Sequence, residues 1–284
     1  MSRPLQHKVF VTRQIPQSGR GSLPDGSTRM WSPITSTLIM GRHDAVLVDP
    51  PLTVEQASDV GDWIAASGRE LRQIYITHGH GDHWFGAMPL LQRFPGVTVR
   101  ATAGTAKLMG EQNSPQFRAD FWDRVFPGQL PVGDVDVTVV DEGGFEIEGV
   151  PLLPVEVGHT DTDATTMLHV PEASLLVAGD VVYNGVHLYL TESGGVTGID
   201  EWLTALDTAE ILNPATVIAG HKAPGAFDSP SQIPATRQYL TDARRLLQSS
   251  ESAEAFYEAM LRLHPNRVNP GALWGAAITL LPPG

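Results

Sequence analysis

The sequence predicts an α/β protein built as one domain, with two sandwiched β-sheets and helices on the outside. An apolar strand at 73–76, a helix at 85–94 and a strand at 97–101 follow one another in the order of a βαβ unit. Strand candidates joined by short turns then crowd residues 135–178, which is typical of antiparallel sheet. No linker-like segment divides the chain, so we expect a single domain over residues 1–284.

For the residues before the βαβ unit, the sequence predicts one long loop and one hairpin. A short strand at 9–11 is followed by residues 16–33, which are rich in Pro, Gly and Ser. A loop of that length in a compact domain is usually functional or disordered, so we expect an N-terminal extension that acts as a lid or a dimer arm. Strands at 37–40 and 45–48 flank a turn that begins at Gly41, which indicates a β-hairpin.

Two pairs of residues mark helix starts. Thr53 and Gln56 have the spacing of a capping box, for a helix that ends near Gly68. Ser114 and Pro115 are a good N-cap and first helical residue. The helix that they begin has an apolar face, which predicts either core packing or an apolar wall over a substrate site. That face carries Phe117, Phe121, Trp122, Val125 and Phe126.

The rest of the chain continues with strands and then helices. Strands are expected at 135–140, 145–147, 152–157, 166–170 and 175–178. Asp200 is expected to cap a helix that runs to Leu212, and a last strand at 216–219 leads into Gly220-His221. Further helices are expected at 105–111, 231–249, 253–263 and 271–280.

Composition excludes several classes of function. The formal net charge is -13, whereas nucleic-acid binding needs a basic surface. There is no cysteine, so disulfides, thiolate metal sites and a cysteine nucleophile are excluded. The N-terminus lacks the apolar run of a signal peptide, and no stretch of about 18 apolar residues indicates a membrane span. We therefore expect a cytoplasmic protein that acts on a small molecule, without nucleic-acid or membrane partners.

The most informative motif follows the strand at 73–76 directly. Residues 77–83 read Thr-His-Gly-His-Gly-Asp-His, the pattern His-x-His-x-Asp-His. Imidazoles and carboxylates are metal ligands by type, and the intervening glycines let the backbone turn so that the side chains converge. The motif predicts a metal centre with His78, His80, Asp82 and His83 as candidate ligands, holding one metal or parts of two.

Three later residues share a context that adds them to this centre. His159, Asp180 and His221 each follow an apolar strand and a glycine. Ligand-type side chains at strand ends gather at one edge of a sheet in α/β folds. A single such residue would be an ordinary turn residue, but three in the same context predict convergence with the motif at 77–83.

With seven candidate ligands in place, the sequence resembles the metallo-β-lactamase superfamily over about residues 35–225. The resemblance implies an αββα sandwich of two mixed β-sheets, with the site at one sheet edge. It also implies the partition of the ligands between two metals. His78, His80 and His159 would bind the first metal, Asp82, His83 and His221 the second, and Asp180 would bridge them.

Such a centre indicates hydrolysis. Two divalent metals roughly 3.5–4 Å apart can share a water and lower its pKa toward about 7, which makes a bridging hydroxide available as nucleophile. Five histidines and two aspartates suit zinc, and they also accept iron, manganese or cobalt. We therefore expect two divalent ions, with zinc first among them, and Asp82 as a catalytic residue.

The substrate is predicted from weaker signals. Tyr183 lies three residues beyond Asp180, as in the acyl-homoserine lactone lactonases that the chain resembles, where this tyrosine hydrogen-bonds the substrate carbonyl. A phenol can donate to an oxyanion without ionising. The sequence thus favours an ester or lactone carbonyl and Tyr183 as a catalytic and carbonyl-orienting residue. The alternatives are a β-lactam or thioester hydrolase, a mononuclear iron enzyme resembling persulfide dioxygenases, and a non-catalytic binding protein.

Other residues near the motif are candidates for substrate contact. Trp84 and Phe85 would wall an apolar pocket or pack at a helix start. His187 and Tyr189 lie in a Gly-rich stretch that we expect to border the site. Lys222 follows His221 and could meet an anionic substrate group.

Overall fold

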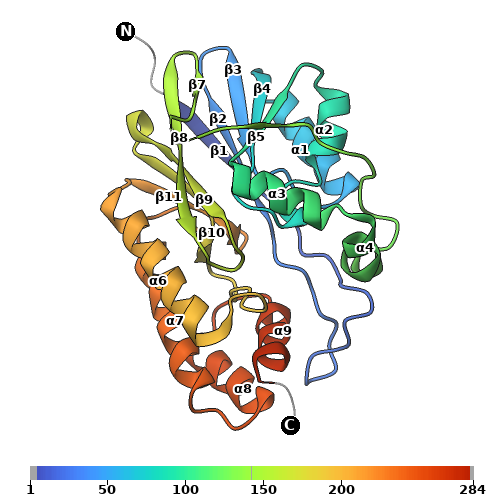
Figure 1. Cartoon of the computed structure of the whole chain (residues 1–284), viewed down its shortest axis with the longest axis vertical. Helices are drawn as coiled ribbons and strands as arrows, with labels where there is room; N and C mark the ends of the chain where they lie inside the picture. Colours follow the sequence, from blue (N-terminus) through green and yellow to red (C-terminus); the bar gives the residue numbers. More distant parts are fainter. Residues whose placement is uncertain (1–4, 142, 282–284) are drawn as a thin grey trace.

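The computed structural model describes residues 5–141 and 143–281 and has two β-sheets packed face to face (Figure 1). The first sheet has the order β1-β2-β3-β4-β5-β6. Its first two pairings are antiparallel and its last three are parallel. The strands are β1 (Gln6–Val11), β2 (Thr35–Met40), β3 (Asp44–Val48), β4 (Glu70–Tyr75), β5 (Thr98–Ala101) and β6 (Val137–Val139).

The second sheet has the order β11-β10-β9-β8-β7. β10 and β11 pair in parallel, and the other pairings are antiparallel, so both sheets are mixed as expected. The strands are β7 (Phe145–Ile147), β8 (Val150–Gly158), β9 (Thr165–Val170), β10 (Leu175–Asn184) and β11 (Thr216–Lys222). The pairing of β10 with β11 shifts register around Gly179, and such irregularities re-aim side chains next to functional sites.

Helices cover the outer faces of both sheets. The first sheet carries α1 (Val54–Ala65), α2 (Ala87–Arg93) and α3 (Ala103–Gln112), and the second carries α6 (Gly195–Ile211) and α7 (Gln232–Leu247) (Figure 1). Next in the chain come α8 (Ala253–Leu263) and α9 (Pro270–Leu280), while α4 (Pro115–Phe117), a π-helical turn (Arg118–Trp122) and α5 (Asp123–Val125) form one irregular helical run. The predicted capping box is confirmed, because Thr53 accepts from Gln56 N and Gln56 accepts from Thr53 N. The predicted cap at Asp200 is wrong: α6 begins five residues earlier, after Gly194, whose backbone is left-handed.

Three apolar clusters fill the layers between these elements. The middle cluster joins the facing sheets and includes Val48 and Tyr75 of the first and Leu168, Val177 and Ile218 of the second. The other two lie between each sheet and its helices. The αββα sandwich expected from the sequence is therefore confirmed, and its buried layers hold the strand ends that carry the site.

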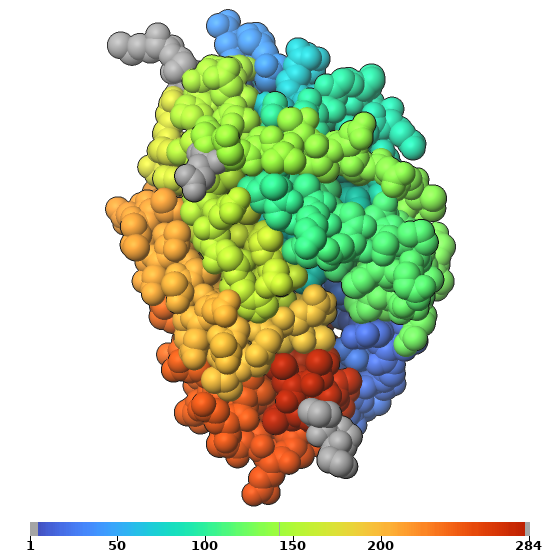
Figure 2. Space-filling model, in the orientation of Figure 1, coloured from blue at the N-terminus to red at the C-terminus, as the bar shows by residue number. Residues whose placement is uncertain are grey.

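The segment 16–33 forms an extended arm beside the sandwich. It folds back on itself through two isolated bridges, Pro16 with Met30 and Ser22 with Thr28. Figure 2 shows this arm, coloured blue, beside the red C-terminal helix α9. The guanidinium of Arg29 donates to the carbonyl oxygen of Gly271 in α9 at 3.1 Å, so the arm is bonded to the C-terminal helix here. Within the described residues, no helix is long and apolar enough to cross a membrane.

Candidate metal centre

The ligand-type residues come together from the segment after β4 in one sheet and from β10 and β11 in the other. His78, His80, Asp82 and His83 follow β4, and the last two lie in a 3-10 turn (Gly81–His83). Asp180 and His221 lie within the neighbouring strands β10 and β11 rather than after them. The strands thus bring together residues that are up to 143 positions apart in the chain, from His78 to His221.

The glycines of the motif are needed for close packing. A Cβ atom at Gly79 would lie 2.3 Å from Cβ of Leu108, and one at Gly81 would lie 2.7 Å from the ring of Phe85. The backbone bends at 77–79 and turns at Gly81–His83 as expected, but neither glycine has a positive φ, so the turn itself does not require glycine. Because the two glycines have no Cβ atom, the motif can pack closely against α3 and the aromatic core.

Among the residues that the structure describes, three overlapping groups of side chains could each hold a metal ion, because their ligand atoms lie within 4.8 Å of one another. The first is His78, His80 and Asp161, the second His78, His83 and Asp180, and the third Asp82, His83 and His221. Asp180 reaches toward two imidazoles at once: its two carboxylate oxygens lie 3.3 Å from Nε2 of His83 and 3.3 Å from Nε2 of His221.

The imidazoles are oriented by partners behind them. One ring nitrogen of each meets an outer oxygen, and the other turns toward the cluster, an arrangement found around metal-bound histidines. The outer contacts are His78 Nδ1 to Thr77 Oγ1 at 3.0 Å, His80 Nε2 to Glu192 Oε2 at 3.2 Å, His83 Nδ1 to Asp49 Oδ2 at 3.2 Å and His221 Nδ1 to the Pro33 carbonyl at 2.8 Å.

Three buried ligand atoms at the centre make no hydrogen bond of good geometry in the described part of the chain, and the ion-pair contacts near them are with other candidate ligands. They are Nε2 of His78, Oδ2 of Asp161 and Oδ1 of Asp180. Buried polar groups are normally satisfied, and leaving one unpaired costs about 1–3 kcal/mol. A cation among these donor atoms would satisfy all three, so the residues present fit a bound divalent metal.

Charge is concentrated here as well. Burial by itself would lower the pKa of His83, but the carboxylates of Asp180, Asp82 and Asp49 outweigh it and raise the pKa to about 10. Burial would likewise raise the pKa of Asp180, but His221 and His83 hold that pKa well below its usual value. The carboxylates therefore favour positive charge among these imidazoles, and a divalent metal held by neutral imidazoles would supply that charge in place of protons.

The structure brings Asp161, not His159, against His78 and His80. Oδ2 of Asp161 lies 3.0 Å from His80 Nδ1 and 3.7 Å from His78 Nε2, and Thr160 holds the other carboxylate oxygen at 2.8 Å. The ring of His159 turns away, with Nδ1 2.6 Å from Asp163 Oδ1. Its Nε2 packs against Gly198 of α6, where a Cβ atom would approach within 2.8 Å.

Tyr183 lies beneath the centre rather than over it. Its side chain is buried, its hydroxyl donates to Oδ2 of Asp180, and its ring stacks on His221. Burial first, and Asp180 next, raise the pKa of Tyr183 well above its ordinary value, so the phenol keeps its proton. In this geometry Tyr183 positions Asp180, and it is not among the residues that line the hollow described next.

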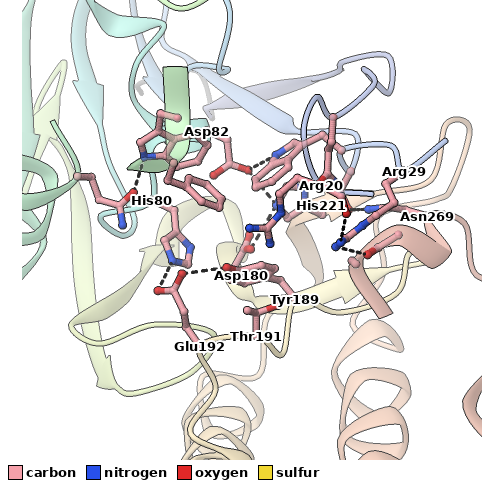
Figure 3. A pocket seen from close by; sticks show the side chains of 18 of the residues that line it. Arg20, Arg29, His80, Asp82, Asp180, Tyr189, Thr191, Glu192, His221 and Asn269 are labelled. Atoms are coloured by element: carbon pink, nitrogen blue, oxygen red, sulfur yellow. Dashed lines mark hydrogen bonds and ion pairs between the residues drawn. The ribbon is translucent and has the colours of Figure 1, made fainter. Parts of the chain in front are cut away.

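A hollow opens beside the three groups and exposes part of them (Figure 3). Its floor includes His80, Asp82, Asp180 and His221, and its walls include aromatic side chains from the irregular helical run and from the arm. The apolar face at 117–126 partly forms a wall of the hollow and partly packs in the core, so both interpretations from the sequence hold in part. Phe117 and Phe121 line the hollow, Trp122 lines it and is buried, and Val125 and Phe126 pack in the core.

Of the side chains predicted to contact substrate, Tyr189 lines this hollow. Trp84 and Phe85 are buried in the core over the first sheet, with Trp84 donating to the Gly79 carbonyl at 3.0 Å. His187 is buried against the hydroxyl of Tyr239 at 3.0 Å. Lys222 is paired with Asp228 at 2.7 Å and does not serve as a free cation.

Buried His187 leads to a prediction about acid stability. Burial, with help from Arg267 and His264, lowers the pKa of His187 to about 3 in the folded chain, against 6.5 for an ordinary histidine. Between these pH values His187 binds a proton in the unfolded chain but not in the folded chain. The free energy of unfolding should therefore be highest above pH ~6.5 and fall toward pH ~3, by at most about 1.4 kcal/mol per pH unit.

Urea unfolding of wild type and His187→Asn at pH 7 and pH 5 tests this prediction. The variant should lose less stability between the two pH values, and equal losses would contradict the assignment.

Comparison with known proteins decides the family. The family model described as the metallo-beta-lactamase superfamily matches residues 29–221. The chain belongs to this superfamily. Its fold agrees with solved metallo-beta-lactamase structures. A metallo-beta-lactamase family protein from Thermus thermophilus has a TM-score of 0.64 and 17% identity, over 96% of this chain and 91% of that one. A beta-lactamase domain protein from Burkholderia ambifaria has a TM-score of 0.64 and 18% identity, over 96% of this chain and 84% of that one.

Sequence relatives cover less of this metallo-beta-lactamase superfamily member. A hydroxyacylglutathione hydrolase of Actinobacillus pleuropneumoniae serotype 5b (strain L20) is 30% identical over 113 residues. That match spans 39% of this chain and 41% of the relative, so the chain matches about two fifths of the length of these relatives.

Sequence reasoning missed several residues of the site. Asp161 could have been suspected, because it lies in the same Gly-His-Thr-Asp turn as His159. Asp49 ends a buried strand, as the predicted ligands do, which was a usable signal. Arg20, Arg29 and Trp31 lie in the arm, and Glu192 lies in a loop. No periodicity marks those four residues.

Proposed function

We propose that this protein is a metal-dependent hydrolase that holds two divalent ions and cleaves an ester or lactone bond. In this proposal His78, His80 and Asp161 hold the first ion, and Asp82, His83 and His221 hold the second. Asp180 reaches both. Zinc suits this mixture of imidazoles and carboxylates, and iron, manganese or cobalt would also be accepted.

One observation carries the proposal. Ligand atoms of four histidines and three aspartates converge in groups within 4.8 Å, and three of those atoms are buried without a hydrogen bond among the described residues. A purely structural polar network would leave such atoms paired. The three groups of ligands also border a hollow with aromatic walls, through which a substrate could reach them (Figure 3).

Bound divalent ions supply an activated water and polarise the carbonyl under attack. The protein's own residues prepare that chemistry. Asp49 and Glu192 fix the rings of His83 and His80, and Tyr183 fixes Asp180 through its hydroxyl. Trp31 of the arm donates to Oδ2 of Asp82 at 2.8 Å, and this bond holds the arm wall of the hollow against the candidate metal centre. The aromatic walls exclude water from the acyl part of a substrate.

A thioester is the second candidate substrate. Supporting it is the 30% identity to a hydroxyacylglutathione hydrolase over 113 residues. Esters, lactones and thioesters share a carbonyl that one centre can attack, so the two candidates differ in the leaving group.

Metal removal combined with a substrate panel tests the proposal. The zinc-loaded protein should hydrolyse at least one ester, lactone or thioester, and dialysis against a chelator should abolish this activity. Adding Zn²⁺, Mn²⁺, Co²⁺ or Fe²⁺ separately shows which ion restores it. His43, which is exposed and outside the three groups, provides the control variant His43→Ala. Full activity in the metal-free protein would contradict the proposal.

A further inference from the structure

The arm places two arginines in the wall of the hollow. Arg20 and Arg29 both line it, together with Trp31 and Tyr189 (Figure 3). The arm is fixed near its C-terminal end, because Trp31 bonds to Asp82 and Arg29 bonds to Gly271 of α9, and near its N-terminal end by the bond from Ser18 N to the Val125 carbonyl at 3.0 Å. The two guanidinium groups therefore keep a defined place relative to the candidate metal centre.

Arg29 is the buried member of the pair. Its side chain belongs to a residue that is only 3% exposed. It donates to the carbonyl oxygens of Arg20 at 3.0 Å and Gly271 at 3.1 Å, and its Nε has no partner within the described chain. Burial first, and the charge of Arg20 next, lower the pKa of Arg29 to about 10, so the group stays charged at neutral pH.

Arg20 is the more exposed member of the pair, and it lines the hollow. Its guanidinium carbon lies 5.2 Å from the centre of the Phe121 ring, which holds the planar group against an aromatic wall. Its Nε is buried and makes no hydrogen bond in the residues described. Arg29 fixes the backbone from which Arg20 projects, through the bond to the Arg20 carbonyl.

Neither arginine has an acidic partner within ion-pair distance in residues 5–141 and 143–281. The carboxylate of Glu192 also lines the hollow, but it bonds to His80 at 3.2 Å and to the Tyr189 hydroxyl at 2.9 Å. Two neighbouring cations without a counter-charge in a partly buried wall are destabilising, and an anion between them and the metals would relieve this.

We propose that Arg20 binds a carboxylate of the substrate, with Arg29 as the positioning residue. The inference rests on the proposed function and narrows it: the preferred substrate is an acyl compound with a carboxylate remote from the bond that is cleaved. The guanidinium offers a planar pair of N–H donors that matches a carboxylate in a bidentate manner. Aromatic walls contact the apolar stem between the two ends of the substrate.

Two esters with the same five-carbon acyl chain test the proposal in the zinc-loaded protein. The mono-p-nitrophenyl ester of glutaric acid ends in a carboxylate, and p-nitrophenyl valerate ends in a methyl group. In Arg20→Gln, the ratio of kcat/KM for the acidic ester to that for the neutral ester should fall about 10- to 100-fold, the usual value of a charge-assisted hydrogen bond. Arg20→Lys keeps the charge without the planar fork and should recover part of the ratio.

The control is Arg262→Gln, because Arg262 is 69% exposed on α8 and lies outside the hollow. It should leave the ratio unchanged. An unchanged ratio in Arg20→Gln would overturn the proposal.

Binding separates this proposal from the proposed function. Glutarate titrated into the zinc-loaded protein by calorimetry should bind about 10-fold or more weaker to Arg20→Gln than to wild type. If Arg20→Gln binds glutarate more weakly than wild type but the protein hydrolyses none of the panel, the carboxylate site is supported and the proposed hydrolase function is contradicted. Equal glutarate affinity in wild type and Arg20→Gln would sink the carboxylate site, whatever the protein hydrolyses.

Discussion

Replacing Asp161 by alanine should remove one metal ion and lower activity by more than about 100-fold. Loss of a group that only orients a ligand costs 10–100-fold in metal affinity or activity, so loss of a ligand itself should exceed that range. Asp161 contributes the only carboxylate of its group, and Oδ2 lies 3.0 Å from His80 Nδ1. Without that oxygen, the first ion would keep only His78, His80 and its share of Asp180, and would bind weakly. Metal content by elemental analysis and kcat/KM on the best substrate of the panel measure both effects.

Two variants from the same turn are matched controls. His159→Ala removes an imidazole that bonds to Asp163 and packs against α6. Asp163→Ala removes a carboxylate that is 78% exposed. Both proteins should keep two metal ions. If His159→Ala loses a metal while Asp161→Ala keeps both, the assignment of the first group is wrong and the ligand is the histidine.

Asp180→Asn should weaken both metal ions and also lower activity by more than about 100-fold, again beyond the range for an orienting group. The substitution keeps the shape of the side chain but removes the negative charge that lies 3.3 Å from both His83 and His221. Because Asp180 belongs to the middle of the three groups, its loss should lower the affinity of both sites. Competition with a chromogenic chelator measures the two affinities separately.

Tyr183→Phe is the matched control for this prediction. It removes the hydroxyl that donates to Asp180 and leaves the ring that stacks on His221. A positioning role predicts a loss of about 10- to 100-fold that appears in metal affinity as well as in kcat. A larger loss than in Asp180→Asn, with metal affinity unchanged, would mean that Tyr183 contacts the reacting atoms instead.

The fold and the ligands at 78–83 could be predicted from the sequence because both depend on patterns among residues that are close in the chain. His78, His80, Asp82 and His83 are close in the chain, so any fold that places them after a buried strand brings them together. Asp180 and His221 lie in the adjacent strands β10 and β11, where the register pairs His221 with Tyr183 and the side chain of Asp180 reaches His221 at 3.3 Å. The helix over 253–263 was predicted with its observed bounds, since Ser252 caps it and its apolar residues repeat with helical spacing.

The side-chain directions in the turn after β8 could not be read in this way. His159 and Asp161 are two positions apart, and either could have faced His80. The choice depends on Thr160, which bonds to Asp161, and on the contact of His159 with α6. Both are outcomes of packing rather than of spacing.

The arm shows the same limit over a longer range. Its position depends on Arg29 meeting Gly271 across 242 residues, and on Trp31 meeting Asp82. No periodicity within 16–33 indicates either partner, so Arg20 could not be placed in the hollow from sequence. The start of α6 was mispredicted at Asp200 because a left-handed Gly194 begins the helix without a side-chain cap.

The central claim is that two metal ions bind at one centre and that both serve hydrolysis. Adding Zn²⁺ stepwise to metal-free protein, while measuring hydrolysis of the best substrate of the panel, tests this most directly. The account predicts that activity continues to rise until two equivalents per chain are bound. Activity that is complete at one equivalent, or that does not depend on added metal, would contradict it.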